Sequence, residues 1–177
     1  MNIFISGGCK NGKSFFAQEL ARKMSVEQCV ELYYIATMIP VDDEDRARIK
    51  RHLHERDGWG FETIEQGVDI CQALKENINP KGAFLLDSVT ALLSNEMFKK
   101  DGTIDLKAGE RVAEELVEFA RKTGNTVFVS DYIYSDGRNF DEYTETYRKA
   151  LAKIDRELAN ICDQVIEVTF GNRYYFK

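Results

Sequence analysis

The residues best suited to chemistry form a glycine-rich loop near the N-terminus. The pattern G-x-x-x-x-G-K-S runs from Gly7 to Ser14, between an apolar run at 2–6 and a helical pattern that begins at Phe15. In this setting the backbone N–H groups and the helix N-terminus point at the phosphates of a nucleotide. Lys13 would neutralise charge on the β- and γ-phosphates, and the Ser14 hydroxyl would bind Mg²⁺. The predicted triphosphate-binding residues are Gly7, Gly8, Cys9, Lys10, Asn11, Gly12, Lys13 and Ser14.

Two predicted strands end in an aspartate, and either could supply the second carboxylate near Mg²⁺. Asp87 follows the apolar run 83–86, and Asp131 follows the run 127–130. Ligands of open α/β sheets bind beyond the carboxyl ends of the strands, where both residues fall. An aspartate at such a place could instead cap the next helix. We take Ser14 and Asp87 as the predicted metal ligands and keep Asp131 as the alternative.

Both histidines of the chain fall in one charged segment, 42–56. Acidic residues open the segment and basic residues follow, an order that suits the dipole of a helix. On a helix, Arg48, His52 and Arg56 would lie on one ridge at i, i+4 and i+8. The two cations would keep His52 neutral and bind a phosphate that it attacks, which makes it a candidate nucleophile. The same pattern also fits a solvated, charge-balanced helix whose histidine has no role.

Three other residues of this segment complete the expectation for the helix. Ile49 and Leu53 are four apart and would anchor it to the body of the protein. His54 is two positions from His52 and would point about 200° away from it around the helix axis. We therefore assign no role to His54.

Composition limits the class of protein. A chain of 177 residues fits one domain, 1–177, and its 44% hydrophobic and 31% charged residues are typical of a soluble globular protein. The net charge of −6 argues against a nucleic-acid partner. The four cysteines form no C-x-x-C pair, so we expect reduced thiols, with neither a zinc site nor a disulfide framework. No charged leader or long apolar run is visible, so we expect a cytoplasmic protein without a membrane span.

Apolar runs alternate with helical patterns along the chain. Strands are predicted at 2–6, 31–36, 61–64, 82–86, 126–130, 164–169 and 173–176, and helices at 15–21, 42–56, 67–77, 88–98, 105–121 and 141–161. The last two strands are joined at Gly171-Asn172 like a hairpin. This alternation predicts an α/β fold with a doubly wound, mainly parallel sheet, of the P-loop NTPase (RecA-like) type, with a C-terminal hairpin.

Ordered motifs over roughly residues 1–98 resemble those of one known family. They are Gly7-Gly8-x-x-x-Gly12-Lys13-Ser14, Tyr34-Ile35-Ala36-Thr37, Asp43-Glu44-x-x-x-Arg48-Ile49-x-x-His52, Arg56, Trp59, Thr63 and Leu85-Leu86-Asp87-x-x-Thr90-x-x-x-x-Asn95. The family is that of adenosylcobinamide kinase / adenosylcobinamide-phosphate guanylyltransferase, from cobalamin biosynthesis.

The resemblance implies a two-step activity. Such an enzyme phosphorylates the aminopropanol hydroxyl of adenosylcobinamide with ATP or GTP. It then takes GMP from GTP onto a histidine and passes it to the new phosphate. By position that histidine is His52, which with Lys13 makes the predicted catalytic pair, while Arg48 and Arg56 join Asp87 among the predicted nucleotide-binding residues. The implied partners are adenosylcobinamide, its phosphate and GTP or ATP, with Mg²⁺ as cofactor and a homotrimer as the assembly.

The second half of the chain departs from the family pattern. After the strand 126–129 the family usually has Asn-Glu-Val-Gly and a Gly-Ile-Val-Pro stretch, where this chain has Ser130-Asp131-Tyr132-Ile133-Tyr134-Ser135-Asp136-Gly137. The usual Asn-Gln of the last helix is replaced by Asp155-Arg156. The tyrosines Tyr132, Tyr134, Tyr143 and Tyr147 could pack at a subunit interface or in the core. Two alternatives stay open: another P-loop small-molecule kinase, in which the helix around His52 is a lid, and a non-catalytic nucleotide-sensing protein.

Overall fold

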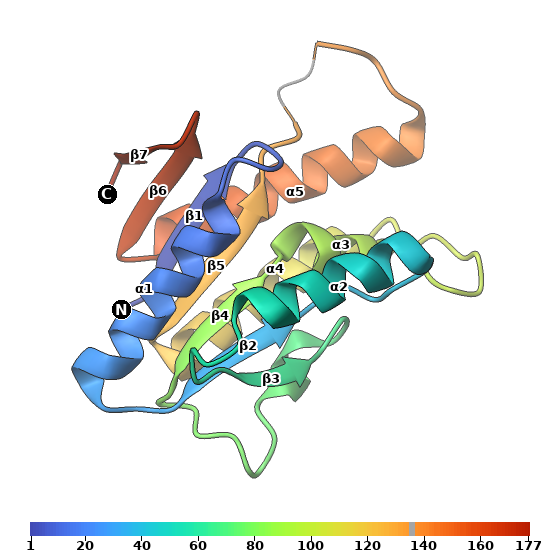
Figure 1. Ribbon diagram of the computed structural model, residues 1–177. Coiled ribbons are helices and arrows are strands. Elements are labelled where there is room, and N and C mark those ends of the chain that lie inside the picture. The colour runs from blue at the N-terminus through green and yellow to red at the C-terminus, as the bar shows by residue number, and fades with distance from the viewer. Residues whose placement is uncertain (135–136) are drawn as a thin grey trace.

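The computed structural model describes residues 1–134 and 137–177, apart from the side chains of Arg48, Arg51, His52 and Glu55 (Figure 1). Its strands are β1 (Ile3–Gly7), β2 (Leu32–Ala36), β3 (Glu62–Glu65), β4 (Ala83–Asp87), β5 (Thr126–Asp131), β6 (Gln164–Thr169) and β7 (Asn172–Tyr175). Its helices are α1 (Lys13–Gln28), α2 (Asp43–Glu55), α3 (Val89–Met97), α4 (Ala108–Thr123) and α5 (Glu142–Ile161), with a short 3₁₀ helix η1 (Ile70–Ala73).

All the strands of the described chain belong to one sheet, in the order β3-β2-β4-β5-β1-β6-β7. Neighbouring strands are parallel except for β6 and β7, which form the antiparallel hairpin predicted at the C-terminus. Strand β1 lies between β5 and β6, so the loop that follows it opens near the middle of the sheet. The predicted α/β architecture is confirmed.

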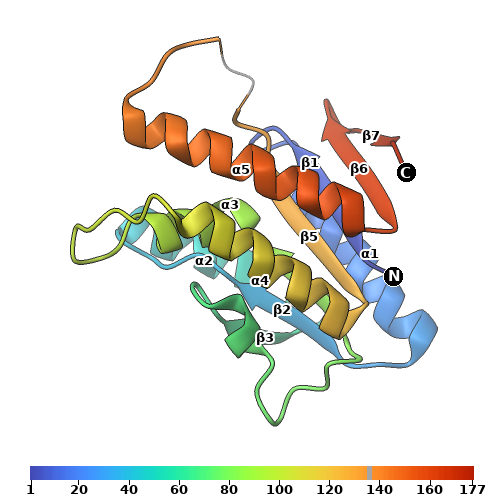
Figure 2. The ribbon, with the colours of Figure 1, turned by 180° about the vertical axis from the view of Figure 1, so that it is seen from behind.

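Helices cover both faces of the sheet (Figures 1 and 2). On one face α1 packs against side chains such as Ile5 and Leu85, and on the other α3, α4 and α5 pack against Phe84, Leu86 and Phe128. Successive residues of a strand point to opposite faces, so a strand buried on both must be apolar throughout. The four apolar residues of β4, from Ala83 to Leu86, are accordingly all fully buried.

The predicted helix at 67–77 is wrong. Only Ile70–Ala73 forms a 3₁₀ turn, and Asp69 before it has a left-handed backbone with φ of 48°. Side chains of α3 take up backbone groups that a helix would have paired: Asn95 donates to the Gly67 carbonyl, and Glu96 accepts from the Asp69 N–H. Tertiary hydrogen bonds therefore override the local helical pattern.

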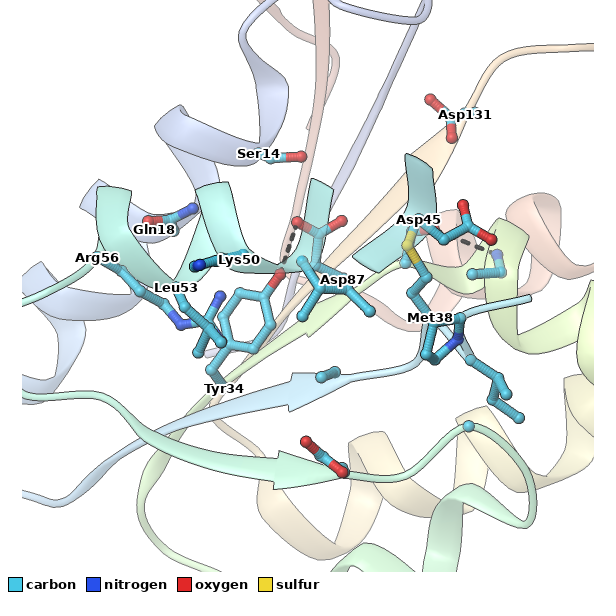
Figure 3. A pocket seen from close by; sticks show the side chains of 18 of the residues that line it. Ser14, Gln18, Tyr34, Met38, Asp45, Lys50, Leu53, Arg56, Asp87 and Asp131 are labelled. Atoms are coloured by element: carbon cyan, nitrogen blue, oxygen red, sulfur yellow. Dashed lines mark hydrogen bonds between the residues drawn. The ribbon is translucent and has the colours of Figure 1, made fainter. Parts of the chain in front are cut away.

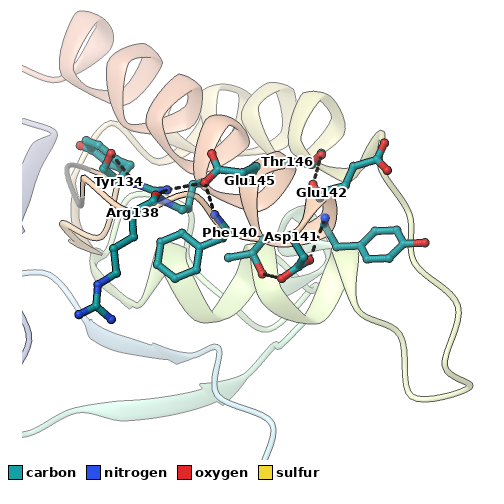
Figure 4. A network of polar contacts seen from close by, with 10 residues as sticks. Tyr134, Arg138, Phe140, Asp141, Glu142, Glu145 and Thr146 are labelled. Carbon is teal, nitrogen blue, oxygen red and sulfur yellow. Dashed lines mark hydrogen bonds and ion pairs between the residues drawn. The ribbon is translucent and has the colours of Figure 1, made fainter.

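The segment between β5 and α5 is tied to the helix by a polar network (Figure 4). Arg148 donates to the carbonyls of Tyr134 and Arg138 and forms an ion pair with Glu145, at 2.6 Å. Asp141 caps α5 by accepting hydrogen bonds from the N–H groups of residues 143 and 144. The described ends of the stretch that departs from the family pattern are therefore fixed against α5.

No helix among the described residues combines the length and the apolar character that a membrane span needs.

Candidate active site

The loop between β1 and α1 has the shape that its glycines predict. Gly12 has φ of 88°, a left-handed conformation that favours glycine, and Phe16 N–H donates to its carbonyl to begin α1. A Cβ on Gly7 would lie 2.3 Å from the Val168 carbonyl oxygen, so no side chain fits there. Asn11 donates from its amide to that same carbonyl. The loop is thus held against β6 and turned toward the pocket.

Lys13 lies under this loop and is almost wholly buried, with 6% of its surface exposed. Its Nζ donates to the Gly8 carbonyl at 3.1 Å and to Asp131 Oδ1 at 2.5 Å. Asp131 ends β5 and is directly opposite Gly7 in the parallel register. The ammonium group is therefore positioned at the mouth of the loop by a charged partner on the neighbouring strand.

Asp87 ends β4, one strand further from the loop than Asp131. Its Oδ2 accepts a hydrogen bond from the Tyr34 hydroxyl at 3.2 Å (Figure 3). Burial, reinforced by the nearby Asp87 charge, raises the pKa of Tyr34, so the hydroxyl stays protonated and able to donate. Arg56 lies over the face of the Tyr34 ring and donates to Thr63 Oγ1.

These groups line one pocket of about 970 Å³, at the upper end of the range for small-molecule sites. Among the predicted site residues, the pocket brings together Cys9, Lys10, Asn11, Gly12, Lys13, Ser14, Arg56 and Asp87. Asp131, the alternative carboxylate, lines it as well. Gly7 and Gly8 contribute to the turn of the loop and are not among the lining residues. The side chains of Arg48 and His52 lie outside the described residues.

The sequence pattern of the cobinamide kinase / cobinamide phosphate guanyltransferase family matches residues 3–175. The chain belongs to this family. It is 34% identical to the bifunctional adenosylcobalamin biosynthesis protein CobU of Escherichia coli (strain K12) over 106 residues, which cover 59% of this chain and 55% of that protein. The matched segment thus spans about half the length of that relative. The protein of the same name from Salmonella typhimurium (strain LT2) is 25% identical over 181 residues, covering 97% of both chains.

Solved structures with this fold include a KaiC-like protein, PH0186, of Pyrococcus horikoshii OT3 and the flagellar accessory protein FlaH of Methanocaldococcus jannaschii. Both align with a TM-score of 0.52, at 15% and 14% identity. The alignments cover 98% and 99% of this chain and 76% and 77% of those chains. At this identity the likeness concerns the fold alone, and it supports the RecA-like type of sheet expected from the sequence.

The oxygen ligands available in this member of the cobinamide kinase family fit Mg²⁺. Ser14 begins the first turn of α1 and Asp87 ends β4, and both line the pocket beside the phosphate loop. A hydroxyl and a carboxylate are ligands that this hard cation prefers, and the bound phosphates would supply others. The pocket therefore suits the predicted metal and triphosphate together.

Gln18 and Tyr34 are among the residues of the pocket that sequence reasoning missed. Gln18 is 2% exposed, lines the pocket and has no hydrogen-bond partner for its Oε1 atom. It lies four residues after Ser14, so helical spacing alone would have placed it on the same face of α1. Tyr34 belongs to one of the family motifs, but spacing alone does not predict that its hydroxyl faces Asp87.

The expectation that Leu53 anchors α2 to the body is wrong, whereas Ile49 is partly buried. Both line the pocket, and Leu53 remains 47% exposed. The helix itself forms as predicted, with Asp42 accepting from the Asp45 N–H at its start. Its apolar side chains line the pocket, and α2 lies on the same side of the sheet as α1 (Figures 1 and 2).

Proposed function

We propose that this protein phosphorylates the aminopropanol hydroxyl of adenosylcobinamide with ATP or GTP and then transfers GMP from GTP, through His52, to the new phosphate. The observation that carries the proposal is the family match over residues 3–175, together with a pocket that contains the phosphate loop and the end of α2. The product would be adenosylcobinamide-GDP, an intermediate of cobalamin biosynthesis.

In the first step the phosphate loop holds the triphosphate in line with the hydroxyl of the corrinoid. Lys13 would direct an N–H donor at the β- and γ-phosphates, and Ser14 with Asp87 would hold Mg²⁺, which would neutralise part of the phosphate charge. Catalysis of this step is mainly positioning and electrostatic stabilisation. The buried position of Lys13 supports this role, because a buried ammonium beside the loop acts in a weakly screened environment.

In the second step His52 attacks the α-phosphorus of GTP. A nitrogen–phosphorus bond forms, the bond to the bridging oxygen breaks, and pyrophosphate leaves. The phosphate of the corrinoid then attacks the same phosphorus and releases the histidine. Helical spacing supports the assignment, since position 52 is three residues after Ile49 and four before Arg56, and both of these line the pocket.

Intact-protein mass spectrometry after incubation with GTP and Mg²⁺ tests the proposal. The parent should carry an acid-labile GMP adduct and His52→Ala should carry none. His54→Ala is the matched control, because it removes the other histidine of the same helix and should keep the adduct. His52→Ala should still phosphorylate adenosylcobinamide, since that step does not use His52.

Three results would decide against parts of this proposal. An adduct that survives His52→Ala and is lost in His54→Ala would show that the nucleophile is His54 and not His52. A parent that forms no adduct but phosphorylates a different hydroxyl compound would favour another small-molecule kinase. Tight nucleotide binding without hydrolysis or transfer would favour a nucleotide-sensing protein.

A further inference from the structure

The ion pair between Lys13 and Asp131 joins the phosphate loop to a carboxylate that the proposed two-step reaction has not used. The two side chains come from positions 118 residues apart, and the Asp131 side chain is 27% exposed toward the pocket that it lines. Its backbone N–H donates to Thr90 Oγ1 at 2.8 Å, which fixes the end of β5. The carboxylate is therefore held in place and accessible to a ligand.

The lysine can keep this partner when a triphosphate binds. An ammonium group has three N–H donors. Two of those on Lys13 are directed at the Gly8 carbonyl and Asp131, so the third is available to a phosphate oxygen. Two hydrogen bonds from one nitrogen place the two acceptor oxygens about 4–5 Å apart. The carboxylate would thus lie close to the phosphoryl group that is transferred.

That spacing admits one hydroxyl oxygen between the carboxylate and the phosphorus. A hydroxyl there could donate its proton to Asp131 and direct its lone pair at the phosphorus. Its oxygen would then lie within hydrogen-bond distance of the carboxylate, as general-base catalysis requires. Asp87 is less suited to this task. It lies one strand further from the loop and already accepts the Tyr34 hydroxyl.

We infer that Asp131 is the general base of the phosphoryl-transfer step, held beside the γ-phosphate by Lys13. The O–H bond of the acceptor hydroxyl breaks and its proton goes to Asp131. The hydroxyl oxygen bonds to the γ-phosphorus, the bond from that phosphorus to the β–γ bridging oxygen breaks, and a nucleoside diphosphate leaves. This inference rests on the proposed kinase function and assigns to Asp131 a role different from the alternative metal ligand considered from the sequence.

Asp131→Asn separates binding from chemistry. It removes the base and the negative charge but keeps an oxygen that can accept from Lys13. Binding of a non-hydrolysable ATP analogue in calorimetry should be as tight as in the parent or tighter, because the variant has one fewer anion beside the phosphates. Single-turnover phosphorylation of adenosylcobinamide should fall on the order of 10²- to 10⁴-fold. Asp131→Glu, which restores a carboxylate, should recover part of the rate.

Glu76→Gln is the control for loss of one carboxylate, since Glu76 is exposed and outside the pocket lining; it should match the parent in both measurements. The inference is overturned if Asp131→Asn phosphorylates as fast as the parent, if it loses analogue binding, or if excess Mg²⁺ restores its rate, as expected for a metal ligand. A parent that phosphorylates no cobinamide would instead overturn the proposed function, and this inference with it.

Discussion

The guanidinium carbon of Arg56 lies 3.7 Å from the centroid of the Tyr34 ring. Tyr34 in turn donates its hydroxyl to Asp87, so a continuous set of contacts runs from the C-terminal end of α2 to the predicted metal-side carboxylate (Figure 3). Arg56 is buried here, and its cation–π contact is partly desolvated and correspondingly strong. These contacts fix the C-terminal end of α2, the helix that contains His52, relative to the end of β4 at Asp87.

Arg56→Lys should slow formation of the GMP adduct without abolishing it. A lysine cannot both cover the Tyr34 ring and donate to Thr63 as the planar guanidinium does, so the end of α2 loses part of its anchorage. We expect a loss of about 1–2 kcal/mol in transition-state stabilisation, or roughly 10-fold in rate.

The rate of GMP incorporation into the protein measures this effect. Thr63→Ala is the matched variant, because it removes only the hydrogen bond and should cost less than Arg56→Lys. A loss as complete as that of His52→Ala would mean that Arg56 takes part in the chemistry itself and does more than position the helix.

Lys13→Ala should abolish triphosphate binding at ordinary concentrations while the chain stays folded. The ammonium faces the pocket and not the apolar core, and its loss removes at least one charge-assisted contact with the phosphates, about 3 kcal/mol or 100-fold in affinity. Calorimetry with GTP and a thermal melt measure the two quantities. Lys23→Ala, on the exposed side of α1, should leave both unchanged. A Lys13→Ala variant that bound GTP like the parent would remove the basis for assigning this loop.

Local patterns were enough to predict the loop and most of the elements around it. The glycine at position 12 fits the left-handed turn, and the strand endings at Asp87 and Asp131 placed both carboxylates at the same edge of the sheet. Parallel strands bring their carboxyl ends together whatever the details of packing. Such features depend on periodicity and on backbone geometry, which a sequence expresses directly.

Features that depend on distant contacts were not predictable in the same way. The Lys13–Asp131 pair joins two strands that are neighbours only in the folded sheet, and the segment around Asp69 follows the side chains of α3 and not its own pattern. The exposure of Leu53 also depends on where α2 lies over the pocket. Each required knowledge of tertiary packing, which local propensity does not contain.

We predict that the protein forms a homotrimer in solution. Of the four tyrosines considered for an interface, Tyr132 and Tyr143 are about half exposed and remain suitable, whereas Tyr134 and Tyr147 pack against the core. Sedimentation at micromolar concentration should give three times the chain mass of 20.3 kDa. A Tyr143→Asp variant would weaken the assembly if that surface is buried between subunits. A monomeric mass for the parent would exclude the trimer.

The last prediction concerns Asp155, a carboxyl of α5 that is only 3% exposed. Burial raises its pKa to about 7, the charge of Asp131 adds to this, and the hydrogen bond that Tyr134 donates at 3.0 Å opposes it. In the unfolded chain the pKa is the ordinary value of 3.8. Between these two values the folded state binds more protons than the unfolded state. The stability due to the neutral carboxyl is therefore fully present below about pH 4 and is lost as the pH rises to about 7.

Asp155→Asn should remove this loss of stability at higher pH, because an amide stays neutral and can still accept from Tyr134. The substitution also restores the residue usual at this place in the family. The free energy of unfolding should then fall less steeply between pH 4 and pH 7, with a gain of up to about 4 kcal/mol at pH 8. Urea unfolding at several pH values measures the slope for the parent, for Asp155→Asn and for Glu157→Gln, a control on the same helix that should keep the parent slope. If the slopes of the parent and Asp155→Asn coincide, Asp155 is already ionised in the folded protein, and its burial is compensated by contacts stronger than the one with Tyr134.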